Sequence, residues 1–182
     1  MDNGKFIVEY GIDIKHKVIH LHGGIDIDAY DQVIRGLALL DNMHPEDDYD
    51  VTLMLSTYGG DIYYGFAIYD ALKAWGGNVK IICNGPVMSA GTIILQAATT
   101  RIMMPHSYLL VHFGEELNTD RQTKMHNDAL DKRMEKLIAG NVKVQAKTVK
   151  KWFSKESYFD ARRALDVGLV DRIFGHEQEE QS

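Results

Sequence analysis

The chain has 182 residues, of which 45% are apolar and 25% charged, a composition typical of one globular domain with a single substantial core. Its formal net charge of −6 argues against nucleic acid or an anionic membrane as a partner. We find no apolar run that could span a bilayer, no signal-peptide pattern and only one cysteine, Cys83, so an intrachain disulfide is excluded. These features predict a cytoplasmic protein in which Cys83 is a buried structural thiol, a catalytic thiol being the alternative.

Short β-like and helical runs alternate along the first hundred residues. The predicted strands cover residues 6–10, 18–22, 51–55 and 79–83, and the predicted helices cover 28–41, 61–75 and a run that begins near residue 90. From residue 18 onward, strand and helix follow one another three times. This alternation predicts parallel strands joined by right-handed crossovers, and therefore an α/β fold.

The second half of the chain begins with two further β-like runs, at 101–104 and 108–113. Residues 120–151 are mostly helical in composition, with a break expected at Gly140 and Asn141. Their apolar stripe is too thin for a core helix, so we expect the segment to project and pack against a partner chain, a solvated surface helix being the alternative. A short helix at 161–165 and a strand at 169–173 follow. We expect a single domain over 1–182, with the acidic end at 175–182 disordered.

Ser89 is the most informative residue of the chain. It lies in Gly85-Pro86-Val87-Met88-Ser89-Ala90-Gly91, where a β-like run turns into a helical one. The first N–H groups of a helix lack intrahelical partners and its dipole favours negative charge, so an oxyanion formed beside Ser89 would meet donors already in place. Ser89 is therefore a candidate nucleophile. Serine is also a favoured N-cap, and the same pattern fits a residue that only caps the helix.

A serine nucleophile needs a general base and oxyanion donors. Among the eight histidines, His112 is the best placed, because a side chain at the carboxyl end of a strand can point into a cleft. A hydrogen-bonded strand histidine is the alternative for His112. Gly59 and Gly60 close one strand and open a helix, so their N–H groups could face an anion or could simply form a tight turn.

Two other histidines, His20 and His22, lie on one face of a predicted strand and could form a metal-binding pair. No Cys or carboxylate at ligand spacing completes such a site. We therefore expect neither a metal nor an organic cofactor.

Several motifs follow one another at the spacing of a known family, namely Ser56-Thr57-Tyr58-Gly59-Gly60-Asp61, Ala67-Ile68-Tyr69-Asp70, Gly85 to Gly91, Pro105 to His112, and Ala161…Ala164…Gly168-Leu169-Val170-Asp171. From about residue 17 to 174 the chain resembles the proteolytic subunit of the Clp proteases, barrel-forming serine peptidases. The resemblance implies a spiral of β-α units related to the crotonase fold, with a protruding helical handle at about 117–152. It also implies Ser89 as nucleophile, His112 as general base, and the N–H groups of Gly60 and Ala90 as oxyanion donors.

Three departures from that family bear on function. Tyr58 stands where the family usually has proline, which alters the rigidity of the turn and removes no oxyanion donor. The third triad member is normally an aspartate, and the matching position here is Glu156, one methylene longer. Asp160 is an alternative orienter, and Glu156 could be only a surface acid. The third departure is the short segment before Val18, where we expect residues 6–10 to form a strand in place of the family's axial loop and amphipathic helix. With Tyr58 before Gly-Gly and Glu156 two residues before an aromatic, the chain resembles the reduced members of the family that bacteriophages encode.

We therefore expect a self-compartmentalising serine endopeptidase that hydrolyses peptides or unfolded proteins. The resemblance implies a homo-oligomeric double ring, with seven subunits per ring as the family's habit, and an AAA+ unfoldase as a possible partner. One alternative is an inactive ring subunit that regulates an active partner. The other is an acyl-CoA enzyme of the crotonase type, which uses similar helix-start N–H groups but has no need for Ser89 and His112 as a pair.

Overall fold

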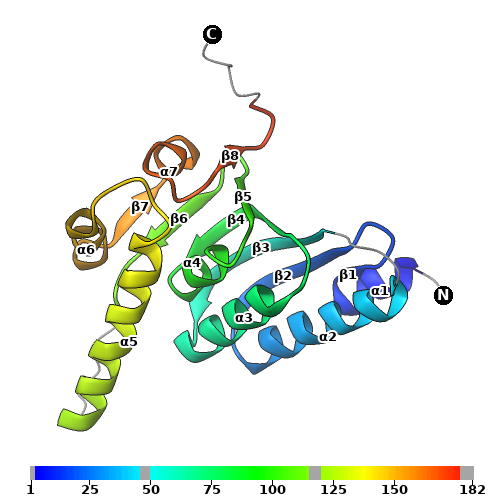
Figure 1. Cartoon of the computed structure of the whole chain (residues 1–182), viewed down its shortest axis with the longest axis horizontal. Coiled ribbons are helices and arrows are strands. Elements are labelled where there is room, and N and C mark those ends of the chain that lie inside the picture. The colour runs from blue at the N-terminus through cyan, green and yellow to red at the C-terminus, as the bar shows by residue number, and fades with distance from the viewer. Residues whose placement is uncertain (1–2, 46–49, 115–119, 177–182) are drawn as a thin grey trace.

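The computed structural model describes residues 3–45, 50–114 and 120–176 (Figure 1). Its strands are β1 (Ile12–Asp13), β2 (Val18–Ile25), β3 (Val51–Gly60), β4 (Val79–Met88), β5 (Thr100–Met103), β6 (Tyr108–Val111), β7 (Ser157–Phe159) and β8 (Arg172–Ile173). Its helices are α1 (Asn3–Tyr10), α2 (Ile27–Met43), α3 (Ile62–Ala74), α4 (Ala90–Leu95), α5 (Arg121–Ala139), α6 (Ala146–Ser154) and α7 (Ala161–Val167). The predicted α/β fold is confirmed.

One sheet runs through the molecule in the order β1-β2-β3-β4-β5-β8, and β6 joins it beside β4 and carries β7. The pairs from β2 through β8 are parallel, as the crossovers α2 and α3 require, whereas β1–β2 and β6–β7 are antiparallel. Strand β4 pairs with β5 along residues 80–83 and with β6 along 86–88. The sheet therefore forks along β4, just before Ser89.

Helices α2, α3 and α4 lie against one face of this sheet (Figure 1). On β3 the residues that face these helices, Val51, Leu53 and Leu55, are completely buried. The residues between them, Thr52 and Met54 among others, are only half-buried. Such alternation is typical of a sheet with one covered face and one open face.

The N-terminal segment corrects the sequence interpretation, because residues 6–10 belong to helix α1 and not to a strand. The β-branched and aromatic residues misled the prediction. The helix is held by Asn3, whose side-chain oxygen accepts the Ile14 N–H (2.9 Å) and whose amide donates to Asp13 Oδ1 (3.0 Å). Phe6 and Tyr10, one helical turn apart, contact each other with ring centroids 5.7 Å apart.

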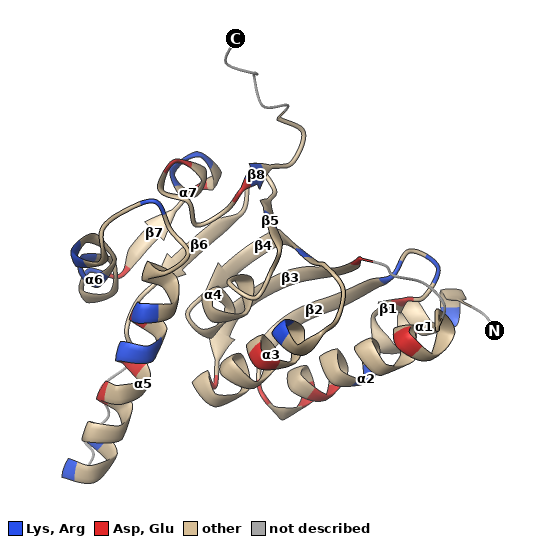
Figure 2. Cartoon of the chain, in the orientation of Figure 1, with Lys and Arg blue, Asp and Glu red and all other residues tan. Residues whose placement is uncertain are grey.

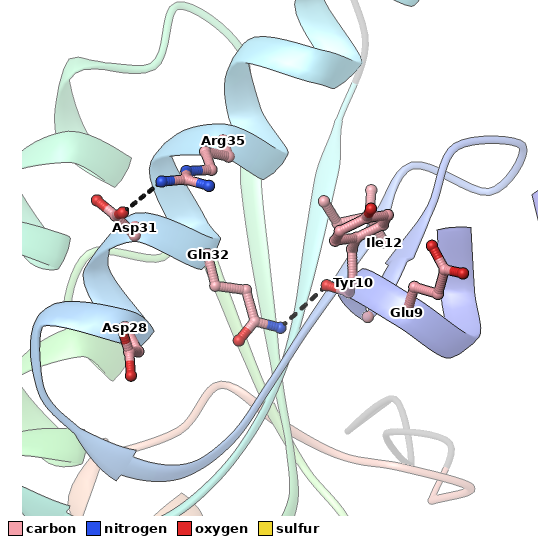
Figure 3. A pocket seen from close by; sticks show the side chains of 8 residues that line it. Glu9, Tyr10, Ile12, Asp28, Asp31, Gln32 and Arg35 are labelled. Carbon is pink, nitrogen blue, oxygen red and sulfur yellow. Dashed lines mark hydrogen bonds and ion pairs between the residues drawn. The ribbon is translucent and has the colours of Figure 1, made fainter. Parts of the chain in front are cut away.

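A cavity of about 420 Å³ lies between α1 and α2 (Figure 3). Its rim carries three carboxylates and one guanidinium, and the Asp31–Arg35 ion pair spans one turn of α2 at 2.7 Å. None of the predicted catalytic residues lines this cavity. It is therefore separate from the candidate active site.

The segment predicted to project breaks where expected, with Gly140 following the end of α5. The first half of α5, residues 121–129, is exposed and extends away from the sheet, with charges of both signs along α5 (Figure 2). The second half was predicted wrongly, because Met134 and Ile138 are buried, as are Val149, Trp152 and Phe153 of α6. The apolar residues of the thin stripe are concentrated in the part that joins the core.

Cys83 is fully buried in β4, and burial raises the pKa of its thiol to about 12, an effect that the Arg101 charge only partly offsets. The thiol form is inert, so the structural interpretation is confirmed and the catalytic alternative is wrong. In the described part of the chain no helix is long and apolar enough to cross a bilayer. The acidic end beyond residue 176 lies outside the described residues.

Candidate active site

Ser89 lies between the end of β4 and the start of α4, with φ 52° and ψ −123°. A positive φ is uncommon for a residue with a side chain, and such strained backbones concentrate at functional sites. The Ser89 side chain makes no capping hydrogen bond, so the alternative of a simple helix cap is wrong. Instead, its carbonyl oxygen accepts both the Thr92 N–H (2.9 Å) and the Thr92 hydroxyl (2.7 Å), which fixes the turn.

The Gly59–Gly60 segment packs directly against this turn, and strand β3 continues through both glycines instead of ending at residue 55 as predicted. Gly59 has φ 101°, and a Cβ built on it would lie 2.6 Å from the Ser89 Cβ. Gly60 has φ 149°, and a Cβ there would lie 2.7 Å from the Ile25 nitrogen. Glycine is required at both positions, because any side chain would collide with Ser89 or with β2.

The N–H groups of this segment have different tasks. The buried Thr57 hydroxyl accepts the Gly59 N–H at 2.9 Å, so Gly59 is already engaged. Gly60 is the predicted oxyanion donor of the pair. The second predicted donor, Ala90, is the first residue of α4, where backbone N–H groups have no intrahelical partner. The structure thus brings Ser89, Gly60 and Ala90 together at one end of the sheet.

His112 follows β6, which ends at Val111 and not at residue 113 as predicted. Ser89 is tied to this strand, because its N–H donates to the Leu110 carbonyl at 3.0 Å. Leu110 precedes His112 by two residues, so the candidate nucleophile and the candidate base leave neighbouring strands at the same end of the sheet.

Glu156 immediately precedes β7, which pairs antiparallel with β6 in the register Val111↔Ser157. If the pairing is continued one residue beyond Val111 and Ser157, Glu156 lies opposite His112. Glu156 is exposed and has φ 48°, one of three positive values among non-glycine residues in the described part of the chain. Asp160 follows the other end of β7, where its side chain caps α7 by accepting the Arg163 N–H at 2.8 Å.

Within the described residues, no hydrogen bond joins Ser89, His112 and Glu156 through their side chains. A cavity of about 730 Å³ begins at Phe113, directly after His112, and extends between α5 and α6. Its lining is strongly charged, with acidic and lysine side chains of α5 and Lys150 of α6. His112 itself does not line this cavity, so the cavity is not evidence for a substrate site at the candidate base.

Sequence reasoning missed three groups that shape the site. Thr57 fixes Gly59, Thr92 fixes the Ser89 carbonyl, and the Leu110 carbonyl accepts the Ser89 N–H. Thr57 lies inside a motif that the sequence had already singled out, so its place beside the glycines was a usable signal. The carbonyl of Leu110 carries no sequence signal, because any residue supplies one.

A serine on a strained turn from strand to helix, facing a glycine turn, is the arrangement by which α/β serine hydrolases expose a nucleophile. The model of the Clp protease family matches residues 5–177. The chain therefore belongs to the Clp protease family, and it is a serine-type endopeptidase.

Two known proteins illustrate this relationship. An ATP-dependent Clp protease proteolytic subunit of Streptococcus uberis is 29% identical over 169 residues, which cover 88% of this chain and 85% of that protein. The structure of a ClpP1 point mutant from Listeria monocytogenes matches with a TM-score of 0.80 at 22% sequence identity. That match covers 90% of this chain and 94% of the other, and it shows that the fold is shared.

Proposed function

We propose that this chain hydrolyses peptide bonds with Ser89 as nucleophile, His112 as general base and Glu156 as the carboxylate that orients His112. The N–H groups of Gly60 and Ala90 bind the oxyanion. The observation that carries the proposal is the backbone of Ser89, which has φ 52° and a side chain free of any capping role, against the Gly59 turn. A serine needed only for the fold would relax into the ordinary N-cap conformation.

In the proposed reaction, Ser89 Oγ attacks the peptide carbonyl carbon while His112 takes the hydroxyl proton. The carbonyl oxygen becomes an oxyanion and accepts hydrogen bonds from Gly60 and Ala90. The imidazolium returns its proton to the leaving amine, and the carbon–nitrogen bond breaks to leave an acyl-enzyme. Water, deprotonated by His112, then releases the peptide acid and restores Ser89. Glu156 stabilises the imidazolium and sets its tautomer.

Labelling with a fluorophosphonate tests the nucleophile. We expect covalent modification of Ser89 in the wild-type chain and none in Ser89→Ala, with peptide hydrolysis lost in that variant and the assembly unchanged. An unlabelled wild-type chain would instead support the alternative of an inactive ring subunit. That alternative is favoured by one observation, the lack of hydrogen bonds between the described side chains of the three triad positions. Peptide hydrolysis by Ser89→Ala would refute the nucleophile assignment.

The choice of carboxylate is tested by a pair of isosteric changes. Glu156→Gln should slow acylation by about 10⁴-fold if it acts as an orienting acid does, because an amide cannot stabilise the imidazolium. Asp160→Asn is the matched control, since asparagine caps a helix as well as aspartate and should preserve α7. Both changes should leave the fold intact. Loss of activity in Asp160→Asn alone would transfer the role to Asp160.

We further propose that the chain assembles into a double ring through two surfaces. The open face of the sheet and the exposed first half of α5 support this proposal, because no other element of the described chain covers either surface. Met125, 63% exposed on α5, provides the test. Met125→Glu should reduce the mass measured by sedimentation, whereas Met43→Glu at the end of α2 should not. An unchanged mass for both variants would refute the role of α5.

Association with an ATP-driven unfoldase belongs to the same proposal, and the name of the Streptococcus uberis relative supports it. A cytoplasmic location is also part of the proposal, because a single buried cysteine is typical of proteins in a reducing compartment. The test is degradation of a stably folded substrate protein by the wild-type chain, with a Clp-type unfoldase added and with or without ATP. We expect degradation only with ATP, and small peptides should be cleaved without it.

A further inference from the structure

Tyr63, near the start of α3, contacts His126 on the projecting first half of α5. The Tyr63 hydroxyl and His126 Nε2 share a hydrogen bond of 2.5 Å, although the two residues are 63 positions apart in the chain. Their rings also stack, with centroids 5.8 Å apart and planes at 16°. Both side chains stay exposed, so the contact does not cover α5. It joins the projecting helix to the helix that follows the glycine turn.

A second contact joins the same two helices. The Arg133 guanidinium of α5 lies over the Phe66 ring of α3, 5.6 Å from its centroid, in a cation–π arrangement. Phe66 follows Tyr63 by three residues, and Arg133 follows His126 by seven, so each pair shares one face of its helix. Helices α3 and α5 therefore meet at two places along matching faces.

The first turn of α3 is connected directly to Gly60, a predicted oxyanion donor. Asp61, the next residue, donates its N–H to the Ile25 carbonyl at 2.7 Å. The Asp61 side chain caps α3 by accepting the Tyr63 N–H, also at 2.7 Å. The backbone from Gly60 to Tyr63 thus forms one short, hydrogen-bonded unit. A shift of Tyr63 is expected to displace the N–H of Gly60.

The other predicted donor, Ala90, also contacts α3. A Cβ built on Gly65 would lie 3.2 Å from the Ala90 Cβ and 3.3 Å from the Ala90 oxygen, so α3 packs closely on the start of α4. Gly65 follows Tyr63 by two residues, and two residues turn a helix by about 200°, so they face opposite sides of α3. Helix α3 therefore lies between α5 and Ala90, with Gly60 just before its first turn.

We infer that Tyr63 is a positioning residue: through its contact with His126 it holds the first turn of α3, and with it the oxyanion donor Gly60. The inference rests on the proposed peptidase mechanism, in which the N–H groups of Gly60 and Ala90 bind the oxyanion. Tyr63 acts through the backbone of α3 and has no chemical part in the reaction. The contact lies within one chain, so it requires no accessible surface in an assembly.

Tyr63→Phe removes the hydroxyl and keeps the stacked ring. Oxyanion donors act on charge that develops in the transition state, so their displacement should lower kcat and leave KM nearly unchanged. We expect kcat for a fluorogenic peptide to fall about five- to tenfold, which is about the most that one hydrogen bond supplies. His126→Phe should cause the same fall, and the double variant no further fall, because both changes break one bond.

Tyr64→Phe is the matched control. It removes a hydroxyl from the next residue of α3, whose ring lies against Tyr30 of α2 with centroids 6.2 Å apart. This variant should keep the wild-type kcat. A fall in kcat as large as that of Tyr63→Phe, or losses that add in the Tyr63→Phe/His126→Phe double variant, would overturn the positioning role.

Amide hydrogen exchange of the full chain tests the contact without the reaction. In Tyr63→Phe the segment 58–66 should exchange about five times faster than in the wild type and in Tyr64→Phe, because loosening of the first turn exposes the N–H groups of Tyr63 and Gly65. Unchanged exchange would overturn the inference whether or not the chain is an active peptidase. Faster exchange with wild-type kcat would overturn the positioning role.

The two measurements keep this inference separate from the proposed function. No peptide hydrolysis by the wild-type chain would refute the proposed function. The exchange rate of segment 58–66 would still decide whether Tyr63 holds the first turn of α3.

Discussion

The contact between Gly59 and Ser89 yields the sharpest prediction, which is the effect of Gly59→Ala. The new Cβ would lie 2.6 Å from the Ser89 Cβ, whereas carbon atoms in contact prefer about 3.5–4.0 Å. Ser89 must therefore move by about 1 Å. A displacement of that size at reacting atoms costs about 10²-fold in rate. Alanine at φ 101° adds backbone strain of about 1–3 kcal/mol.

Gly23→Ala separates these two effects. Gly23 has φ 105°, almost the value of Gly59, and a Cβ built on it meets nothing within 4 Å. The Gly23→Ala variant should therefore be destabilised by the backbone strain alone and should keep the wild-type catalytic rate. The assay is kcat/KM for a fluorogenic peptide together with the urea midpoint of each variant. If Gly59→Ala keeps the wild-type rate, or if Gly23→Ala loses as much activity, the close packing of the glycine turn on Ser89 is not what positions the nucleophile.

Three further predictions concern stored strain and charge. Ser89→Gly should abolish activity, yet its free energy of unfolding should be about 1 kcal/mol higher than that of Ser89→Ala, because glycine accepts φ 52° without strain. Equal urea midpoints for the two variants would contradict this prediction. Asp171→Asn should cost about 1.5–3 kcal/mol in urea unfolding, since Arg101 donates to both Asp171 carboxylate oxygens, whereas Asp166→Asn should cost under about 0.5 kcal/mol because its ion pair on α7 is exposed. Asp13 has its pKa lowered from 3.8 to about 2, because hydrogen bonds from Asn3 and His16 outweigh the effect of burial. A lowered folded-state pKa stabilises the chain above pH 4, so this contribution should disappear between about pH 4 and 2, and the pH dependence of unfolding should be weaker in Asp13→Asn.

The sequence predicted the parts of the fold that depend on local pattern. Alternating β-like and helical runs predicted the parallel sheet and its crossovers, and the glycine-bounded run around residue 89 predicted the turn from β4 into α4. These signals are local, because the period of apolar residues and the position of glycine are set by neighbouring residues. The same locality explains why the prediction of α2 differs from the structure by only one or two residues at each end.

The errors have a common physical origin in contacts between distant residues. Helix α1 is a run of aromatic and β-branched residues that favour strands, and it becomes a helix where Asn3 bonds to the turn after β1. The second half of α5 is buried because α6 folds back onto it, which no stripe on α5 alone could reveal. For the same reason Thr57 was missed, since its hydroxyl matters only through the Gly59 N–H.

The candidate catalytic residues stay predictions, and backbone strain provides the strongest argument for them. Only three non-glycine residues in the described chain have a positive φ, and two of these are Ser89 and Glu156. Each such backbone costs about 1–3 kcal/mol and persists only where the surroundings enforce it. At Ser89 the enforcing contacts are its N–H bond to Leu110 and the two bonds from Thr92 to its carbonyl.

Glu156 is exposed, so burial does not account for its positive φ. Glu156 precedes β7, where the register with β6 sets it opposite His112, while Asp160 is already engaged as the cap of α7. Glu156 is the residue after the C-cap of α6, where a left-handed residue commonly ends a helix, so its positive φ also fits a surface acid. The same conformation is expected if it turns the carboxylate toward His112, which is the role that Glu156→Gln tests.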